Sequence, residues 1–492
     1  MTTQERPISD LEAIEAALAD PAVSHIVEIV LSRRGDGFRA ASHTGSVEFR
    51  VDPDGVHIDA VTGVDPIADT DPDRFVGHLD EIDGEHPDAT TNSYPYAHDQ
   101  IAQFFSSPEA PDLYVSRTAS HHAGGNIGDH GNLGVVQARA PFIAAGPGVR
   151  PQGLVDGHGR MVDVAPTVAA LAGVARTRGL DRWGAPIDGV LLKRQDGRVL
   201  DDLLDGIATD RVVVFLWDGL NANQLYAAID EGDAPVAAGL LKRGVGLRSG
   251  LFASLPTLTL ANHNTAVTGV HPGHSGILHN TWYDRATRTV HDLLDVQQMM
   301  HSRDHLSPHI ETLHEAIKRS FPDAWTGTTY EFCDRGADAS SFADMAAGRR
   351  VPFPRRTDEF DRDDWFEASD HYRFMSNVDE CSLRMAVDQW TSDDHSLPRF
   401  GWYSFALTDE ASHEAGPHHD EARAAIRDTD RRTGKVLRAI EEAGVLEDVT
   451  VLIIADHGMQ TNDPTNDGNY GDALASTGID HLDVGNGMIY LT

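Results

Sequence analysis

Three acidic residues follow apolar, β-branched runs in this chain, and two of them are accompanied by histidine. Asp218 follows "RVVVFLW", Asp409 ends "FGWYSFALTD" and Asp456 follows "VTVLIIA". His413 comes four residues after Asp409, and His457 follows Asp456 directly. Carboxylate and imidazole groups are ligands for divalent cations such as zinc. The two Asp–His pairs therefore suggest two neighbouring metal ions.

Each of these residues also has an ordinary structural explanation. A single aspartate at a strand end often caps a helix or forms a turn, and any one of the 26 histidines could be a hydrogen-bonded polar residue. If the segment after Asp409 is helical, Asp409 and His413 share a face. Asp456 and His457 are adjacent at a strand end, so we expect them to point to different sides. Three acidic residues at equivalent positions favour a functional site.

The stretch "SLPTLTLANHNTAVTG" at 254–269 could supply a nucleophile. Pro256 ends a predicted strand, Thr259 stands where a helix should begin and Gly269 where it should end. The free N–H groups of a first helical turn form a natural anion site. A hydroxyl there that touches a metal could ionise and attack phosphorus. The alternative is that Thr259 only caps the helix.

These residues need elements that bring them to one edge of the fold. The runs 24–32, 211–219, 400–409 and 449–458 predict buried strands of a parallel sheet covered on both faces. Helical patterns occupy 10–19, 163–173, 259–268, 309–319 and 418–444. Because the carboxyl ends of parallel strands line a ligand crevice, the acidic residues would meet there. The predicted fold class is an α/β sandwich.

Two regions lack a clear periodicity of apolar residues. Residues 177–210 are rich in Gly and Asp and are interpreted as a connector. The stretch 333–369 includes "GRRVPFPRRTDEFDRDDW" and is interpreted as part of a surface insertion.

Composition excludes several classes of partner. The 492 residues carry 77 acidic and 40 basic side chains, a net charge of −37, which would repel nucleic acid and anionic membranes. This acidity fits a salt-loving or high-GC organism or, equally, ordinary solubility charge. The two cysteines suggest no disulfide framework. We expect no secretory signal and no membrane span, and therefore a cytoplasmic protein.

In combination, "FLWDG", "SLPTLTLANHNTAVTGVHPGHSGILHN", "LTDEASH" and "IIADHGM" resemble the nucleotide pyrophosphatase/phosphodiesterase branch of the alkaline phosphatase superfamily. The resemblance implies an alkaline-phosphatase-like α/β/α sandwich with a mostly parallel central sheet. It implies Thr259 as the nucleophile, and Asn280 with the Leu260 N–H as the groups that bind the phosphoryl oxygens. The implied zinc ligands are Asp218, Thr259, Asp456 and His457 for one ion, and Asp409 and His413 for the other.

The family needs one more histidine ligand, in a C-terminal part that usually contains a His-Gly motif, an apolar strand and a D-V-A-P-T helix. Here that pattern stands at 128–173, before the nucleophile. The tripeptide Asp-His-Gly consequently occurs twice, in "GNIGDHGNLG" and in "LIIADHGMQT". We interpret the two copies as two parts of one site in a circularly permuted chain. His130 is then the missing ligand, with His121 and His122 as competing candidates.

In family order the chain would run 211–492 and then 1–176. The first segment would correspond to the N-terminal part of the catalytic domain, with a cap insertion around 285–395, and the second to its C-terminal part. Residues 177–210 would connect them. Such rearrangement is tolerable because domain termini often lie close together. This permuted order predicts that the strand near Tyr490 lies beside the helix that starts near Ser9.

The resemblance implies a two-zinc phosphoester hydrolase, a type I phosphodiesterase or nucleotide pyrophosphatase that acts through a phospho-threonine on a small phosphoester substrate. Leu260 replaces a residue that is commonly Phe in nucleotide-cleaving relatives, so a nucleotide preference is left open. Within the superfamily, phosphonate (C–P) hydrolysis or phosphomonoester hydrolysis are alternatives. A non-catalytic binding protein that retains the fold is an alternative of another class, against which the complete ligand set argues.

Overall fold

Two large sheets organise the chain. The computed structural model describes residues 8–84, 86–118, 125–349, 369–466 and 468–492. The larger sheet has eight strands in the order β19-β18-β20-β13-β21-β8-β14-β9. Their bounds are β8 Phe142–Ala145, β9 Gly153–Val155, β13 Arg211–Trp217, β14 Gly244–Leu247, β18 Thr326–Thr329, β19 Ala339–Ser340, β20 Phe400–Phe405 and β21 Val449–Ile454.

This eight-stranded sheet is mostly parallel, as predicted. Strands β18, β19, β20, β13 and β21 pair in parallel, and β14 pairs in parallel with β9. Only the pairings of β8, with β21 and with β14, are antiparallel. The strands β13, β20 and β21 are buried along nearly their whole length, which accounts for their continuous apolar sequences.

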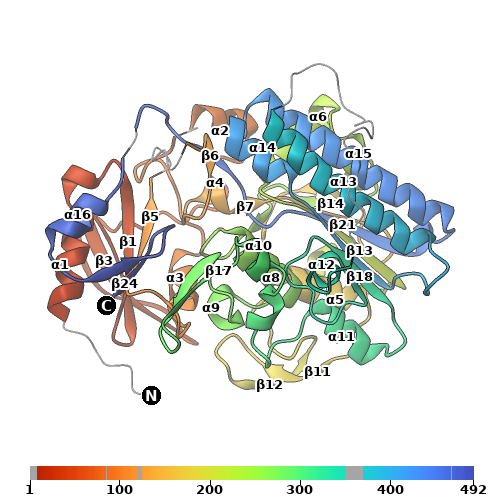
Figure 1. Cartoon of the computed structure of the whole chain (residues 1–492), viewed down its shortest axis with the longest axis horizontal. Coiled ribbons are helices and arrows are strands. Elements are labelled where there is room, and N and C mark those ends of the chain that lie inside the picture. Colours follow the sequence, from red (N-terminus) through yellow and green to blue (C-terminus); the bar gives the residue numbers. More distant parts are fainter. Residues whose placement is uncertain (1–7, 85, 119–124, 350–368, 467) are drawn as a thin grey trace.

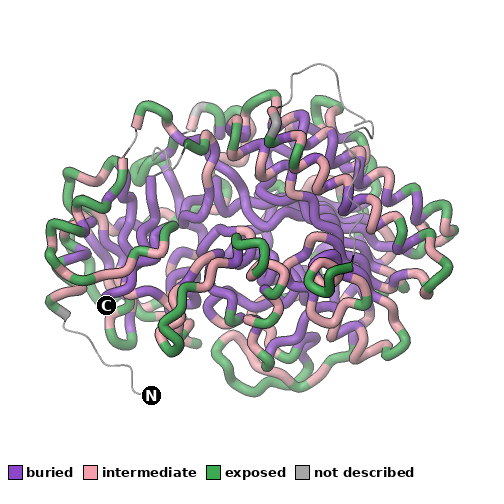
Figure 2. Tube along the Cα trace, in the orientation of Figure 1, coloured by how far each residue is buried: buried purple, intermediate pink, exposed green. Residues whose placement is uncertain are grey.

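Helices cover both faces of the eight-stranded sheet, with α6, α13, α14 and α15 above it and α5, α8 and α11 below it in Figure 1. Figure 2 shows the strands between these layers as the buried centre of the molecule. The architecture is therefore the α/β sandwich that the sequence predicts. The bounds are α5 Val164–Leu171, α6 Ala222–Glu231, α7 Pro235–Arg243, α8 Thr259–Thr268, α11 Leu313–Ser320, α13 Asp370–Thr391, α14 Leu407–Ala415 and α15 Asp420–Glu442.

The second sheet is antiparallel and has the order β23-β24-β5-β1-β2-β3-β4. Its bounds are β1 Val27–Arg34, β2 Gly37–Ser42, β3 Gly45–Asp52, β4 Gly55–Gly63, β5 Leu113–Arg117, β23 His481–Asp483 and β24 Met488–Leu491. The run 24–32, expected in the parallel sheet, is β1 of this antiparallel one. That prediction was wrong because continuous apolarity reports burial on both faces and not strand direction.

The two ends of the described chain meet in this antiparallel sheet. Helix α1 (Ile8–Leu18) packs Ile14 and Leu18 into one apolar cluster with Ile489 and Leu491 of β24. Both elements lie at the same end of the molecule in Figure 1. The predicted neighbourhood of the strand near Tyr490 and the helix near Ser9 is confirmed.

The region 285–395 is only in part peripheral. It contributes β18 and β19 to the eight-stranded sheet, and α13 packs beside α14 and α15. The expectation of one cap insertion across this region therefore needs correction, because β18 pairs directly with β20. Residues 350–368, within the expected surface insertion at 333–369, lie outside the described residues.

The connector at 177–210 forms a hairpin of β11 (Thr177–Leu180) and β12 (Pro186–Val190), followed by irregular chain. Its Asp196 carboxylate accepts hydrogen bonds from the His271 backbone N–H at 2.9 Å and from His274 Nδ1 at 2.6 Å. The connector is thereby fixed to the start of α9 (Pro272–Ser275), which follows α8.

The remaining elements are short, and no helix among the described residues is long and apolar enough to cross a membrane. The helices are α2 His78–Asp83, α3 Ala97–Phe104, α4 Val135–Ala138, α9 Pro272–Ser275, α10 Val296–Met299, α12 Ser341–Ala346 and α16 Gly471–Ser476. The strands are β6 Gly128–Asp129, β7 Arg139–Ala140, β10 Gly159–Arg160, β15 Leu251–Phe252, β16 Thr281–Asp284, β17 Thr289–Asp292 and β22 Gln460–Thr461.

Candidate metal centre and nucleophile

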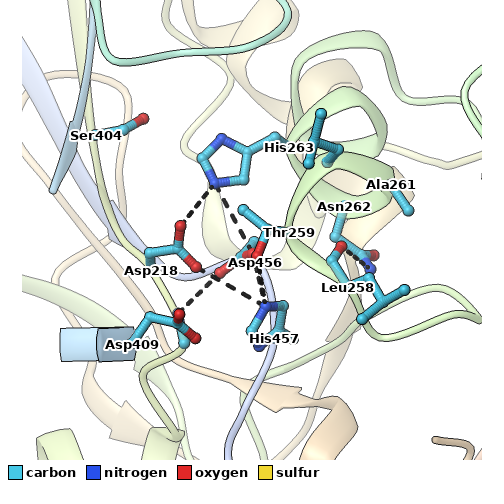
Figure 3. A network of polar contacts seen from close by, with 12 residues as sticks. Asp218, Leu258, Thr259, Ala261, Asn262, His263, Ser404, Asp409, Asp456 and His457 are labelled. Atoms are coloured by element: carbon cyan, nitrogen blue, oxygen red, sulfur yellow. Dashed lines mark hydrogen bonds and ion pairs between the residues drawn. The ribbon is translucent and has the colours of Figure 1, made fainter. Parts of the chain in front are cut away.

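Three acidic residues converge at the carboxyl ends of neighbouring parallel strands. Asp218 follows β13 directly, Asp456 follows β21, and Asp409 lies in the first turn of α14 after β20. Figure 3 shows the three carboxylates facing one another. Their convergence is the strand-end crevice expected of a parallel sheet.

Gly219 permits this close approach. Its backbone has φ +65°, and a Cβ at this position would lie 2.3 Å from Asp409 Oδ1. Its N–H donates to Asp456 Oδ1 at 3.0 Å. Any side chain at residue 219 would therefore displace one carboxylate while the backbone holds another.

The first group of candidate ligands surrounds His457. Its Nε2 lies 3.0 Å from Asp456 Oδ2, 3.8 Å from Asp218 Oδ1 and 3.3 Å from Thr259 Oγ1. The expectation that Asp456 and His457 point to different sides is wrong. Strand β21 ends at Ile454, so the alternation of a strand no longer applies two residues later.

The second group joins residues from distant parts of the sequence. Asp409 and His413 lie one helical turn apart on α14, with Asp409 Oδ2 3.5 Å from His413 Nε2. His130 Nε2 lies 3.7 Å from Asp409 Oδ1 and 3.1 Å from His413 Nε2. The predicted neighbourhood of His130, Asp409 and His413 is confirmed. His121 and His122 lie outside the described residues.

Backbone carbonyls orient both histidines of the second group. His130 Nδ1 lies 2.8 Å from the Thr257 carbonyl oxygen, and His413 Nδ1 lies 2.8 Å from the Gly128 carbonyl oxygen. A carbonyl only accepts, so each Nδ1 carries the proton and donates it. In the neutral form of each ring, Nε2 then faces the site with its lone pair, which is the arrangement found for histidines that bind metals.

The two Asp-His-Gly copies lie side by side. Strand β6 contains Asp129 of the first copy and pairs antiparallel with β22, which begins soon after the second copy. The rings of His130 and His457 stack with centroids 3.8 Å apart. The copies are therefore adjacent parts of one cluster.

The electrostatics of the cluster favour cations. Burial, together with the charges of Asp456 and Asp409, raises the pKa of Asp218 to about 8. Burial alone would lower the pKa of His457, but Asp456 outweighs it and raises that pKa to about 9. For His130, burial and then the nearby His457 lower the pKa to about 3. A buried site with this much negative charge is stabilised by positive charge.

Unsatisfied oxygens indicate that the residues fit divalent cations. Asp218 Oδ1 and Asp409 Oδ1 are buried and accept no hydrogen bond from the described residues. Three sets of ligand atoms in the cluster each lie within 4.8 Å of one another. Oxygen and imidazole nitrogen in such sets suit zinc and similar ions.

Thr259 is the first residue of α8 and is only partly buried. Its position at the helix start agrees with the sequence. Leu260, by contrast, is fully buried, and its N–H donates to Asn280 Oδ1 at 3.1 Å. To bind a phosphoryl oxygen, as the resemblance implies, this N–H would have to leave the Asn280 amide.

Two residues of the cluster escaped the sequence analysis. His263 lies one helical turn after Thr259, and Figure 3 shows its ring above Asp218 and Asp456. Glu331 follows β18 and contacts His263. His263 carried a usable signal, its helical spacing from the nucleophile position, but Glu331 had none, because the strand before it is short and only weakly apolar.

Comparison with known proteins gives a consistent family. The model of the type I phosphodiesterase / nucleotide pyrophosphatase family matches residues 212–492. A pyrophosphatase/phosphodiesterase of Schizosaccharomyces pombe is 24% identical over 259 residues, which are 52% of this chain and 45% of that protein. The Bos taurus bis(5'-adenosyl)-triphosphatase is 24% identical over 253 residues, 51% of this chain and 47% of that protein.

Among solved structures, murine ectonucleotide pyrophosphatase/phosphodiesterase 5 matches with a TM-score of 0.37 and 18% identity, over 50% of this chain and 57% of that one. Phosphonoacetate hydrolase of Sinorhizobium meliloti matches with a TM-score of 0.34 and 19% identity, over 52% of this chain and 58% of that one. The chain thus spans about half the length of the first curated relatives it matches.

Proposed function

Because this chain belongs to the type I phosphodiesterase / nucleotide pyrophosphatase family, we propose that it is a metal-dependent phosphoester hydrolase that cleaves small diesters through a phospho-threonine at Thr259. One observation carries the proposal. The Thr259 hydroxyl, at the start of α8, lies 3.3 Å from His457 Nε2, within a cluster of carboxylates and histidines. A hydroxyl that only capped its helix would not need such neighbours.

Two ions would occupy the cluster. Asp218, Thr259, Asp456 and His457 would hold one, and Asp409, His413 and His130 the other. Zinc fits best, because the set mixes carboxylate oxygen with imidazole nitrogen. When bound, such ions lower the pKa of a contacting hydroxyl or water and neutralise charge on phosphoryl and leaving oxygens.

The chain's own residues would carry the covalent steps. Thr259 Oγ1 gives up its proton to solvent and forms a bond to phosphorus while the bond to the leaving oxygen breaks on the opposite side. The leaving alkoxide takes a proton from water and departs as an alcohol. Water then cleaves the phospho-threonine and restores the hydroxyl. The N–H groups of the first turn of α8 other than that of Leu260, which donates to Asn280, favour the anionic substrate. The Asn280 amide donates to a non-bridging oxygen, which stabilises the charge that develops there.

The order of the chain is part of the proposal. The segment 1–176 would correspond to the C-terminal part of the family's catalytic domain, 211–492 to its N-terminal part, and 177–210 to a connector, all within one catalytic domain. Two observations support this order: the family model matches from residue 212 onward, and His130 lies beside Asp409 and His413. The contact of α1 with β24 agrees with it.

A substrate panel tests the activity. The zinc-loaded protein should hydrolyse bis-p-nitrophenyl phosphate faster than p-nitrophenyl phosphate, and should leave phosphonoacetate intact. Chelation should remove this activity and added zinc should restore it. Faster cleavage of the monoester or of phosphonoacetate would overturn the diester assignment. Binding of phosphate without turnover of any of the three would indicate a non-catalytic protein.

A further inference from the structure

His263 is buried next to the proposed centre, yet it is none of the seven residues assigned to the two ions. It lies on α8, one turn beyond Thr259, and has no exposed surface. Its Nε2 makes no hydrogen bond with the described residues. A buried ring nitrogen that makes no hydrogen bond is costly, so the orientation of this ring requires a reason.

Glu331 fixes the other side of the ring. His263 Nδ1 lies 2.8 Å from Glu331 Oε2, and a carboxylate accepts from that nitrogen. Glu331 is itself fully buried and held by the Cys333 N–H at 2.9 Å and by Ser404 Oγ at 3.2 Å. The ring of Phe332 packs edge-on against His263 with centroids 5.0 Å apart. The imidazole therefore has one orientation.

That orientation directs Nε2 at the two carboxylates. It lies 3.5 Å from Asp218 Oδ2 and 3.8 Å from Asp456 Oδ2. Asp218 has its other oxygen, Oδ1, on the side of His457. His263 thus faces the outer oxygen of Asp218, while the inner oxygen faces the ligands around Thr259, as Figure 3 shows.

We propose that His263, held by Glu331, is a positioning residue that fixes the Asp218 and Asp456 carboxylates for the first ion. The proposal rests on the proposed function, since it assumes that these carboxylates bind a cation. The linked groups come from the ends of β18, β20 and β13 and from α8, so they tie the nucleophile helix to the sheet edge. Outer partners of this kind typically change metal affinity about 10–100-fold.

Zinc affinity measured by chelator competition tests the proposal. His263→Gln should raise the dissociation constant of one of the two zinc ions by roughly 10–100-fold and leave that of the other unchanged within about 2-fold. Glu331→Gln keeps an acceptor for Nδ1–H and should raise the same dissociation constant by a smaller factor. Because Glu331 acts through His263, the double variant should bind as weakly as His263→Gln alone.

His314→Gln is the matched control. His314 is also a fully buried histidine, packed against Phe400, and neither ring nitrogen has a hydrogen-bond partner among the described residues. Its replacement tests the general effect of changing a buried histidine and should leave both constants unchanged. Circular dichroism of all variants checks the fold, and Glu331→Gln gives the result on its own if His263→Gln does not fold.

Equal affinities in wild type, His263→Gln and Glu331→Gln would overturn the proposal, as would a loss shared equally by both ions or reproduced by His314→Gln. The proposed function fails separately if chelator competition shows that the wild-type protein itself binds fewer than two zinc ions. In that case the positioning role falls with it.

Discussion

The Thr259 hydroxyl occupies the point where the helix start, His457 and the strand-end carboxylates meet. Replacing it tests the covalent route. Thr259→Ala should lower kcat for the diester by roughly 10⁴-fold or more, since loss of a covalent nucleophile removes the first chemical step. Thr259→Ser should recover part of that loss. Steady-state kinetics with zinc content measured in parallel gives the answer, and near wild-type turnover in Thr259→Ala would refute the nucleophile.

His130 and His413 lie 283 residues apart in the sequence but should behave as a pair. His130→Ala and His413→Ala should each lower the affinity for one zinc ion. The loss should exceed the ~10–100-fold typical of a residue that only holds a metal ligand in place, and both variants should affect the same ion. Each removes one Nε2 that faces Asp409. Isothermal titration with zinc measures this. Unchanged binding in His130→Ala alone would exclude it from the second ion.

At this scale the sequence predicted much of the cluster. Strand-end aspartates, the Asp409–His413 spacing and the position of Thr259 all followed from local periodicity. The relation of Asp456 to His457 did not, because it depends on where β21 ends. Glu331 and His263 were missed for another reason: their contact joins β18 to α8, and no local pattern reports a contact across the fold.

Among the elements, β1 carries a buried titratable group that should make stability depend on pH. Burial raises the pKa of Glu28 to about 7, against the hydrogen bond that Tyr94 Oη donates at 2.8 Å. The folded state therefore holds this proton more tightly than the unfolded chain. The stabilisation is complete below the unfolded pKa of 4.5 and is lost as pH rises through about 7.

Glu28→Gln should remove this dependence, because the amide keeps an acceptor for Tyr94 without a titrating proton. Between about pH 4.5 and pH 8, the stability of wild type relative to Glu28→Gln should fall by about 3 kcal/mol. Urea unfolding at a series of pH values measures the difference. A constant difference across this range would contradict a raised pKa for Glu28.

The sequence predicted whether a segment forms a helix or a strand better than it predicted which strands pair with one another. Helix α8 has the expected bounds, and α15 ends two residues before Gly444. Strand β1 was correctly expected but placed in the wrong sheet, and β18 within the region 285–395 was not expected at all. Its sequence "TGTT" is short and only weakly apolar, so its place beside β20 depends on tertiary pairing.

For the molecule as a whole, the net charge of −37 predicts self-repulsion in the folded state. The melting temperature should rise with KCl up to ~0.1–0.2 M, where the Debye length falls to ~10 Å or less. A further rise in molar KCl would identify a salt-adapted protein, and a plateau would assign the acidity to solubility. Differential scanning calorimetry across this range measures it. No rise at low salt would contradict the self-repulsion.

The proposed chain order also belongs to this scale. It explains how residues near the first Asp-His-Gly come to lie beside residues near the second, with β6 and β22 paired, and why the antiparallel sheet takes strands from both ends of the described chain. The order of the motifs predicted this arrangement, because the metal ligands in 211–492 are one histidine short and the segment 1–176 supplies it.

One measurement tests the central claim most directly: a crystal structure of the zinc-loaded protein with inorganic phosphate, with ions located by anomalous scattering at the zinc edge. Two peaks are predicted, one among Asp218, Thr259, Asp456 and His457 and one among Asp409, His413 and His130. His130 Nε2 should lie ~2.0–2.1 Å from the second, with the phosphate beside Thr259. A single ion in the cluster, or a second ion without His130, would contradict the account.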